Sequence, residues 1–315
     1  MTRAPWKWLA DRIESLDPET DSDEIMRLVA EHQLNDPIVN LTLLVTTAQT
    51  ALPPTASATL VGTGKMLHRG EERFHDGSGY LMTWFTQGAR SEATRASVER
   101  LNRYHLGLAR RFPGAFGDND EYVYTLCAVG DFLPRMRETL GLPPQSPTLD
   151  VAWHHFLRDL AELFRGEHGA VTGFPDDLAG VRAFAARFEA RDWPSTPEGH
   201  ELAEGMVNQY AERFFPPPMR WFARTQALLL MPPRVREVHR TGEPGRVAGA
   251  VVRLTMRWVI RAQESWWPDR RRRFSETRAG RRGQARARRR TARMQRRYDR
   301  RVARGEIAPP RPEDA

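Results

Sequence analysis

The chain has 315 residues, which is long enough to bury a large core, and its hydrophobic content of 40% is typical of a globular protein. Cys127 is the only cysteine, which excludes internal disulfides, thiolate metal cages and iron–sulfur clusters held by four cysteines. No window reaches the roughly 18 apolar residues of a membrane-spanning helix. Asp11 and Glu14 interrupt the N-terminus before a secretory signal could form. We therefore expect a soluble, cytoplasmic protein.

The net charge of +8 belongs to one end of the chain. Residues 268–315 hold 18 arginines and 6 acidic residues, a net charge of +12, which leaves −4 for residues 1–267. We therefore expect an N-terminal segment (1–22), one large helical domain (23–267) and an arginine-rich tail (268–315) that is partly helical or disordered. The tail is interpreted as a solvated surface, and the alternatives are a nucleic-acid arm or an anchor to anionic membranes through residues 270–304. With only Phe274 and Tyr298 to stack on bases, no specific nucleic-acid recognition is expected.

Helical periodicity dominates the chain, and no convincing strand alternation is present. Prolines, glycines and capping residues mark the helix ends. The first predicted helices run from Asp21 or Ser22 to His32, from Asp36-Pro37 to Pro53-Pro54, over 80–87 between Gly79 and Gly88, and onward from Ser91. The later ones run from Asp118 to Pro143-Pro144 and over 149–164, 178–190, 196–215, 222–230 and 245–264. The pattern predicts a single all-α domain of roughly ten helices.

Three familiar constellations fail on their spacing. Gly62-Thr-Gly64-Lys65 lacks the first glycine of a phosphate loop, the hydroxyl residue after the lysine and a preceding buried strand. A di-iron carboxylate bundle needs two Glu-x-x-His units, and the chain has one, from Glu72 to His75. His154 and His155 are adjacent, so on a helix at most one points inward, as a core histidine.

His105 is the most informative candidate. On a helix it shares one face with four apolar residues: Val98, Leu101, Leu108 and Phe112. A histidine directed inward is either satisfied by a hydrogen bond or binds something, and a satisfied core histidine is the more frequent case. A lone histidine on an apolar helix face is also how a protein presents an axial ligand to haem iron. Both interpretations of His105 remain open from the residues alone.

Several segments, taken in order, resemble the MpaB/latex-clearing-protein family, which includes the rubber oxygenases. The likeness spans roughly residues 23–240, and each segment is weak alone, but their shared order and spacing are specific. The segments are Asp36-Pro37, Gly62-Thr-Gly64-Lys65, Arg73-Phe-His-Asp76, Arg90-x-x-x-Thr94, Val98-Glu-Arg-Leu101-Asn102-Arg-Tyr-His105, Asn119-Asp-Glu-Tyr122-Val-Tyr124-Thr-Leu126 and Leu229-Leu-Met-Pro232-Pro-Arg234-Val-Arg236.

The resemblance implies an all-α fold that binds haem b and uses O2 to oxidise or cleave a C=C bond. It implies His105 as the proximal iron ligand, Arg90 and Arg73 as further cofactor-binding residues, and Arg90, Thr94 and Asp76 as catalytic residues. Two departures from the family pattern stand out: Ala93 replaces the lysine of rubber-cleaving members, and Asp76-Gly77 replaces the acid–threonine pair of the fungal-like subgroup.

One geometric expectation follows for the same helix. On a continuous helix, Thr94 and His105 lie about 16 Å apart along the axis, so both cannot touch one iron. Either the helix breaks near Ser91, or Thr94 meets the porphyrin edge.

The sequence therefore supports three hypotheses about function. The first is a haem-dependent oxygenase acting with O2 on an apolar, prenyl-like substrate. The second is a catalytically silent member of the same fold that acts as a binding protein, which the absence of the lysine and the threonine favours. The third is a polyanion-binding or membrane-surface protein that acts through the arginine-rich tail. The oligomeric state is not determined by the sequence.

Overall fold

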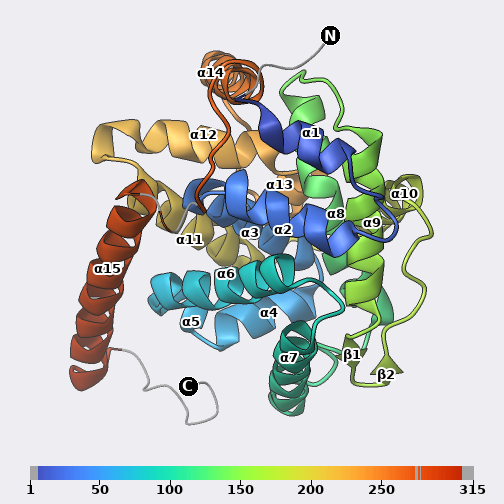
Figure 1. The fold of residues 1–315 in the computed structure, drawn as a ribbon. Coiled ribbons are helices and arrows are strands. Elements are labelled where there is room, and N and C mark those ends of the chain that lie inside the picture. Colours follow the sequence, from blue (N-terminus) through green and yellow to red (C-terminus); the bar gives the residue numbers. More distant parts are fainter. Residues whose placement is uncertain (1–5, 274–275, 277, 307–315) are drawn as a thin grey trace.

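The computed structural model describes residues 6–273, 276 and 278–306, and in these residues it confirms a single all-α domain (Figure 1). The two strands, β1 (Arg165–Gly166) and β2 (Gly169–Ala170), form a two-residue antiparallel hairpin. The helices are α1 (Trp8–Glu14), α2 (Ser22–His32), α3 (Asp36–Thr50), α4 (Pro54–Gly62), α5 (Lys65–His68), α6 (Gly70–Gln87), α7 (Glu92–Arg111), α8 (Asn119–Thr139), α9 (Pro147–Ala161), α10 (Leu178–Glu189), α11 (Pro197–Phe214), α12 (Arg220–Leu230), α13 (Pro233–His239), α14 (Arg246–Ser265) and α15 (Arg278–Ala303). A short 3₁₀ turn, Pro217–Met219, precedes α12.

The main core lies where α3, α8, α9, α10 and α11 meet. α3 packs on α8 and α11, and α8 packs on α9 and α10. Each of these helices presents an apolar face inward, which is what stabilises helices in a globular protein beyond their own propensity. The largest fully buried side chains include Leu41, Leu44, Tyr124, Phe156, Leu157, Phe188 and Tyr210.

Most predicted helix starts are confirmed, because their capping residues act locally. Ser91 caps α7 by accepting a hydrogen bond from the backbone N–H of Thr94 at 3.1 Å. Asp118 caps α8 in the same way, through the N–H of Asp120 at 2.8 Å. The predicted starts of α2 and α3 are also confirmed. Because α7 runs unbroken from Glu92 to Arg111, Thr94 and His105 belong to one continuous helix.

One predicted helix start is wrong, and α4 was not predicted. α6 begins at Gly70 rather than Tyr80, so Gly77 and Gly79 lie inside the helix instead of before it. Pro53-Pro54 follows the end of α3, as expected, but Pro54 also opens α4, which was not predicted. Proline at a first helical position costs no hydrogen bond, so a Pro-Pro pair both ends one helix and begins the next.

A tight turn at Gly88 joins α6 to α7 and fixes both to α2. Gly88 has φ +88°, and a Cβ at this position would lie 2.6 Å from the carboxylate of Asp23. That carboxylate accepts hydrogen bonds from the N–H groups of Ala89, at 2.7 Å, and Arg90, at 3.4 Å. Only glycine combines the positive φ with so close an approach.

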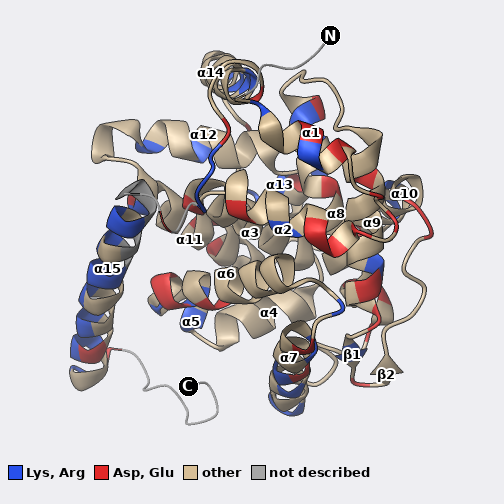
Figure 2. Ribbon diagram, in the orientation of Figure 1, with Lys and Arg blue, Asp and Glu red and all other residues tan. Residues whose placement is uncertain are grey.

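The flanking segments contact the main body. α1 lies inside the expected segment 1–22 and packs on α2 and α9 through Leu9 and Ile13. Within the tail, Asp269 pairs with Lys7, and α15 lies along one side of the molecule against α6 (Figure 1). Arginines are spread along the whole length of α15 (Figure 2). The outer ends of both segments, residues 1–5 and 307–315, lie outside the described residues. No described helix has the length and apolarity needed to cross a bilayer.

Candidate functional site

A cavity of about 640 Å³ lies between α3, α4, α6, α7 and α8, and α5 and α9 also contribute residues to its wall. This volume falls inside the range of about 300–1,000 Å³ that is usual for ligand-binding pockets. The cavity wall is mostly apolar and aromatic. Its apolar members include Leu43, Leu60, Leu81, Trp84, Phe85, Leu101, Leu108, Phe116, Leu126, Val129, Leu157, Leu160 and Phe164.

Threonines in the wall do not make it polar. The hydroxyl groups of Thr46, Thr59 and Thr125 each donate to the carbonyl oxygen four residues earlier on the same helix, at 2.7–2.9 Å. These hydroxyls are therefore satisfied by their own backbones. An apolar ligand can contact the wall without leaving them unpaired.

His105 lies in this wall, half-buried, with its ring stacked on Phe116 at 4.6 Å between centroids. Its Nδ1 is buried and has no hydrogen-bond partner among the described residues. Burial, reinforced by the nearby charge of Arg73, lowers the pKa of His105 to about 4. The imidazole is therefore neutral at neutral pH and keeps a free lone pair, as metal ligation requires.

Arg73 and Gly77 shape the part of the cavity that belongs to α6. Arg73 lines the cavity and forms no ion pair with any residue that the structure describes. Burial lowers the pKa of Arg73, and Asp76 opposes this effect. A Cβ at Gly77 would lie 2.8 Å from Nη1 of Arg73, so the missing side chain at position 77 leaves room for the guanidinium. The glycine at position 77 thus coincides with an arginine in the cavity.

The charged end of the cavity is a compact ion-pair cluster. Lys65 Nζ lies 2.7 Å from an oxygen of Asp76 and 3.1 Å from an oxygen of Glu72. All three residues line the cavity. Lys65, one of the two lysines in the chain, is therefore held by two carboxylates here, and Asp76 faces the cavity beside it.

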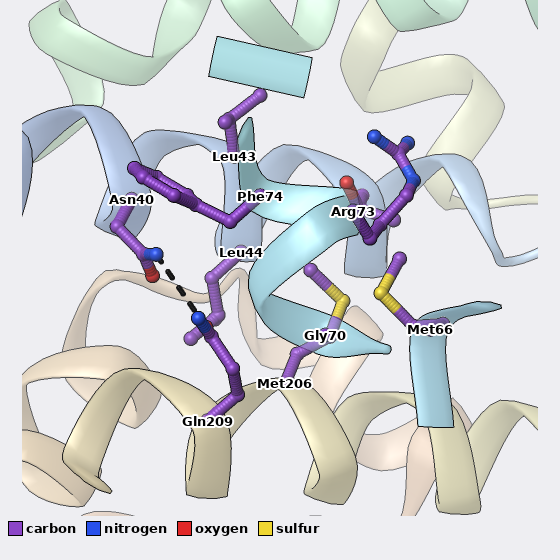
Figure 3. A pocket seen from close by; sticks show the side chains of 10 residues that line it. Asn40, Leu43, Leu44, Met66, Gly70, Arg73, Phe74, Met206 and Gln209 are labelled. Carbon is purple, nitrogen blue, oxygen red and sulfur yellow. Dashed lines mark hydrogen bonds between the residues drawn. The ribbon is translucent and has the colours of Figure 1, made fainter. Parts of the chain in front are cut away.

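Arg73 also borders a second, much smaller hollow of about 30 Å³ between α3, α6 and α11. In this hollow Asn40 and Gln209 share a hydrogen bond of 3.4 Å (Figure 3). The guanidinium of Arg73 points away from this pair (Figure 3). The small hollow holds little more than a water molecule, so the large cavity is the candidate site.

Two further wall residues were not predicted from the sequence to be functional. Burial and the charge of Asp118 raise the pKa of Glu121 to about 7. Burial also raises the pKa of Tyr122 to about 12, and the hydroxyl of Tyr122 is buried without a described partner. Tyr122 lies beside His105, at 6.2 Å between ring centroids. Glu121 and Tyr122 belong to segment 119–126, but the sequence does not show that they are buried, because their burial depends on the tertiary fold.

Arg90 and Thr94 lie elsewhere. Neither lines the cavity. Nε of Arg90 donates to Asp159 at 2.6 Å, and the Arg90 side chain is 49% exposed. Thr94 is fully buried in the first turn of α7, about 16 Å along the helix from His105, and its hydroxyl has no described partner. The structure thus brings His105, Arg73 and Asp76 to one cavity and leaves Arg90 and Thr94 outside it.

The other histidine candidates fit structural roles. Nε2 of His154 lies 2.8 Å from the carbonyl oxygen of Pro175, and the side chain is buried. His155 does not line the cavity, although its Nδ1 is buried without a described partner. Within the described residues, no group of three or more histidine, cysteine or acidic side chains could hold a metal ion.

The residues around the cavity fit haem. Haem needs one neutral imidazole ligand, apolar walls for its macrocycle and a cation for its propionates. His105, whose Nδ1 has no partner in the described part of the chain, meets the first need, and the aromatic wall and Arg73 meet the other two. A site with a single protein ligand to iron is compatible with the lack of a multi-residue metal cluster in the described chain.

No family model matches the chain. No curated protein matches it either.

Proposed function

We propose that the protein is a haem-dependent oxygenase that acts on an apolar, prenyl-like substrate. The observation that carries this proposal is a neutral His105 in the wall of a 640 Å³ apolar cavity that also contains Arg73. Bound haem b would supply the reaction with O2, which side chains alone do not perform. The resemblance of residues 23–240 to the rubber-oxygenase family supports the same function. A cytoplasmic location, with contact to membranes at their surface, suits an enzyme for apolar substrates.

The chain's own residues would contribute binding, orientation and proton handling. His105 would ligate the iron, and Arg73 would pair with a propionate. The aromatic and leucine-rich wall would exclude water and hold a hydrocarbon substrate. Asp76, positioned by Lys65 at 2.7 Å, would accept a proton from the substrate at its carboxylate.

A second candidate is an apolar-ligand-binding protein without catalysis. The position of Arg90 favours it, because the family's Arg-x-x-x-Thr pair lies outside the cavity here. In this case the Lys65 and Arg73 end would bind the polar head of an elongated ligand. Haem binding separates the two candidates, since only the oxygenase requires it.

The test is haem loading of His105→Ala and of a matched control. His155→Ala removes a histidine whose Nδ1 is also buried without a partner among the described residues, but which lies outside the cavity. Protein expressed with a haem supply should show an intense Soret band and near-stoichiometric pyridine haemochrome in the wild type and in His155→Ala. His105→Ala should lose most of both. Equal, near-stoichiometric haem in all three proteins would disprove the ligand assignment, and no haem in any would favour the binding protein.

A second pair of variants tests which arginine serves the cofactor. Arg73→Gln should weaken haem binding by about tenfold, because a charge-assisted pair to a propionate is lost. Arg90→Gln makes the same change outside the cavity and should leave haem affinity unchanged. Haem titration followed at the Soret band measures both. If Arg90→Gln weakened haem binding more than Arg73→Gln did, Arg90 rather than Arg73 would bind the cofactor, as the family resemblance implies.

A further inference from the structure

α14 carries an apolar stripe on its outer side. Val247, Val251, Leu254 and Trp258 are 78%, 43%, 64% and 56% exposed. Their spacing of four, three and four residues places them within about 60° of the helix circumference. We call these four residues the α14 stripe. Exposed apolar residues scattered singly need no explanation, but a contiguous row of four does.

The stripe is not the face that packs on the protein. Val252, Met256 and Ala262 form the buried face of α14, which rests on α12. α14 lies at the top of the molecule in the view of Figure 1, away from α4, α6 and α7. No residue of α14 lines the cavity. The stripe is therefore a second apolar face without a partner in the described chain, and it is separate from the candidate active site.

Tryptophans extend the stripe beyond the end of the helix. Trp266 and Trp267 follow α14 directly and are 65% and 44% exposed. The ring of Trp267 lies edge-on to that of Trp258, at 6.0 Å between centroids. Trp6, 50% exposed, is held nearby because its carbonyl oxygen accepts a hydrogen bond from the N–H of Asp269. Tryptophan favours the boundary between water and lipid, because its large apolar ring carries one N–H.

Arginines border the stripe on one side. Arg246, Arg253, Arg257 and Arg261 lie on the adjacent face of the helix and are exposed. None of them forms an ion pair with a described residue. The only acidic residue of α14, Glu264, is paired with Arg137 at 2.5 Å. The surface is therefore both apolar and strongly cationic.

We propose that α14 docks the protein on an anionic lipid bilayer, with the stripe and the flanking tryptophans in the interface and the arginines on the phosphate groups. An amphipathic helix with bulky apolar residues beside arginines is the form that lies in the plane of a membrane surface. Arginine side chains reach the head groups while their stems cover apolar surface. A second copy of the chain is the less suitable occupant, because two α14 helices would bring their arginines together.

The experiment is binding of the full-length protein to vesicles. The vesicles contain phosphatidylcholine alone or with 30 mol% phosphatidylglycerol, and binding is measured by co-sedimentation at low and at physiological salt. Wild type should bind the anionic vesicles and not the neutral ones. Arg253→Gln with Arg257→Gln should weaken binding about 30-fold, since each basic residue near an anionic surface contributes a factor of about five. Leu254→Gln with Trp258→Gln should weaken it at least about tenfold.

The matched control is Arg95→Gln with Arg100→Gln. These two exposed arginines of α7 have no described ion pair, and α7 lies at the opposite end of the molecule (Figure 1). This control should bind like the wild type, because the charge change is the same but lies off the docking surface. All variants should keep the wild-type melting temperature, since the substituted side chains are exposed.

Three outcomes would overturn the proposal. In the first, the α14 variants bind anionic vesicles as well as the wild type, which would assign binding to the arginine-rich tail. In the second, the α7 control loses as much affinity as the α14 arginine variant, which would make the attraction one of net charge alone. In the third, the wild type binds no vesicles and instead forms a dimer, by analytical ultracentrifugation, that Leu254→Gln dissociates.

Discussion

Glu121 shows how the cavity changes the chemistry of a single residue. Burial, with the charge of Asp118, raises its pKa from 4.5 to about 7. Between these values the folded protein binds more protons than the unfolded chain, so stability falls as the pH rises from about 4.5 to about 7. Below this window both states are protonated and the carboxyl costs nothing. Above it, the folded protein carries the full cost of a buried carboxylate.

We therefore predict that Glu121→Gln stabilises the protein in a pH-dependent way. The free energy of unfolding should rise by about 1–2 kcal/mol at pH 8 and stay unchanged near pH 4. This gain is smaller than the full pKa shift implies, because solvent screens the partly exposed carboxylate. Urea unfolding at the two pH values measures the effect. Glu138→Gln, at an exposed position on the same helix, is the control and should have little effect at either pH. A gain of equal size at pH 4 would show that the carboxyl charge is not its cause.

For single residues, the sequence predicted part of the candidate site. The apolar face of α7 singled out His105 correctly as an inward-facing residue, because helical spacing is a local property. The cavity position of Arg73 and the burial of the Tyr122 hydroxyl depend on how α6 and α8 meet α7. No local pattern contains that information. For the same reason the sequence could not show that Arg90 pairs with Asp159, which is 69 residues away.

Among the elements, helix ends were predicted best where one side chain satisfies the backbone. Ser91, Asp118 and Thr196 cap α7, α8 and α11 by accepting a backbone N–H. The start of α6 was predicted ten residues too late, because Gly77 and Gly79 lower helix propensity locally. The packing of α6 on α2, α3 and α7 stabilises the helix through these glycines. Tertiary contacts therefore overrode the local preference.

A buried ion pair joins α6 to α11 and offers a test of how these elements depend on each other. Nη1 of Arg213 lies 2.5 Å from Oε2 of Glu71, and both side chains are nearly inaccessible, at 4% and 5%. The guanidinium also lies over the ring of Phe74, 3.9 Å from its centroid. Either charge alone would be buried without compensation.

We predict that Glu71→Leu and Arg213→Met each lower the free energy of unfolding by about 3–5 kcal/mol, because each leaves one buried charge unpaired. The double variant should cost less than the sum of the two by about 1–3 kcal/mol, since it leaves no charge behind. Urea unfolding of the wild type, the two single variants and the double variant gives the four free energies of this double-mutant cycle. Strictly additive losses would mean that the two side chains do not stabilise each other.

On the scale of the whole molecule, the structural boundary between the body and the basic tail is less sharp than the change in net charge at residue 268. Asp269 accepts hydrogen bonds from Lys7 and from the N–H of Leu9, and Arg273 pairs with Glu31 at 3.1 Å. The start of the basic tail is therefore fastened to the N-terminal helices. Beyond it, Tyr298 of α15 packs on the body: its side chain is 8% exposed and lies under Arg69. Most of the arginines of α15 face solvent.

These contacts predict different results for two truncations. A chain that ends at Arg273 keeps the contacts of Asp269 and Arg273 and should lose only about 1–2 kcal/mol, from Tyr298. A chain that ends at Pro268 should lose a further 1–3 kcal/mol or so, from the broken ion pairs and hydrogen bonds. Both should still fold, because the main core is built from residues 26–256. Thermal unfolding measures the three stabilities, and equal values for the two truncations would mean that Asp269 and Arg273 stabilise nothing.

The same truncations separate the two cationic surfaces of the molecule. DNA carries a phosphate lattice that exposed arginines of α15 can neutralise with release of counterions, so full-length protein should bind it with a steep salt dependence. The chain that ends at Arg273 should lose most of that affinity. It should still bind anionic vesicles, because the α14 stripe needs apolar burial as well as charge. If this truncation bound DNA as tightly as the full chain, the tail would not be the polyanion surface. If it lost vesicles and DNA together, tail charge alone would explain both.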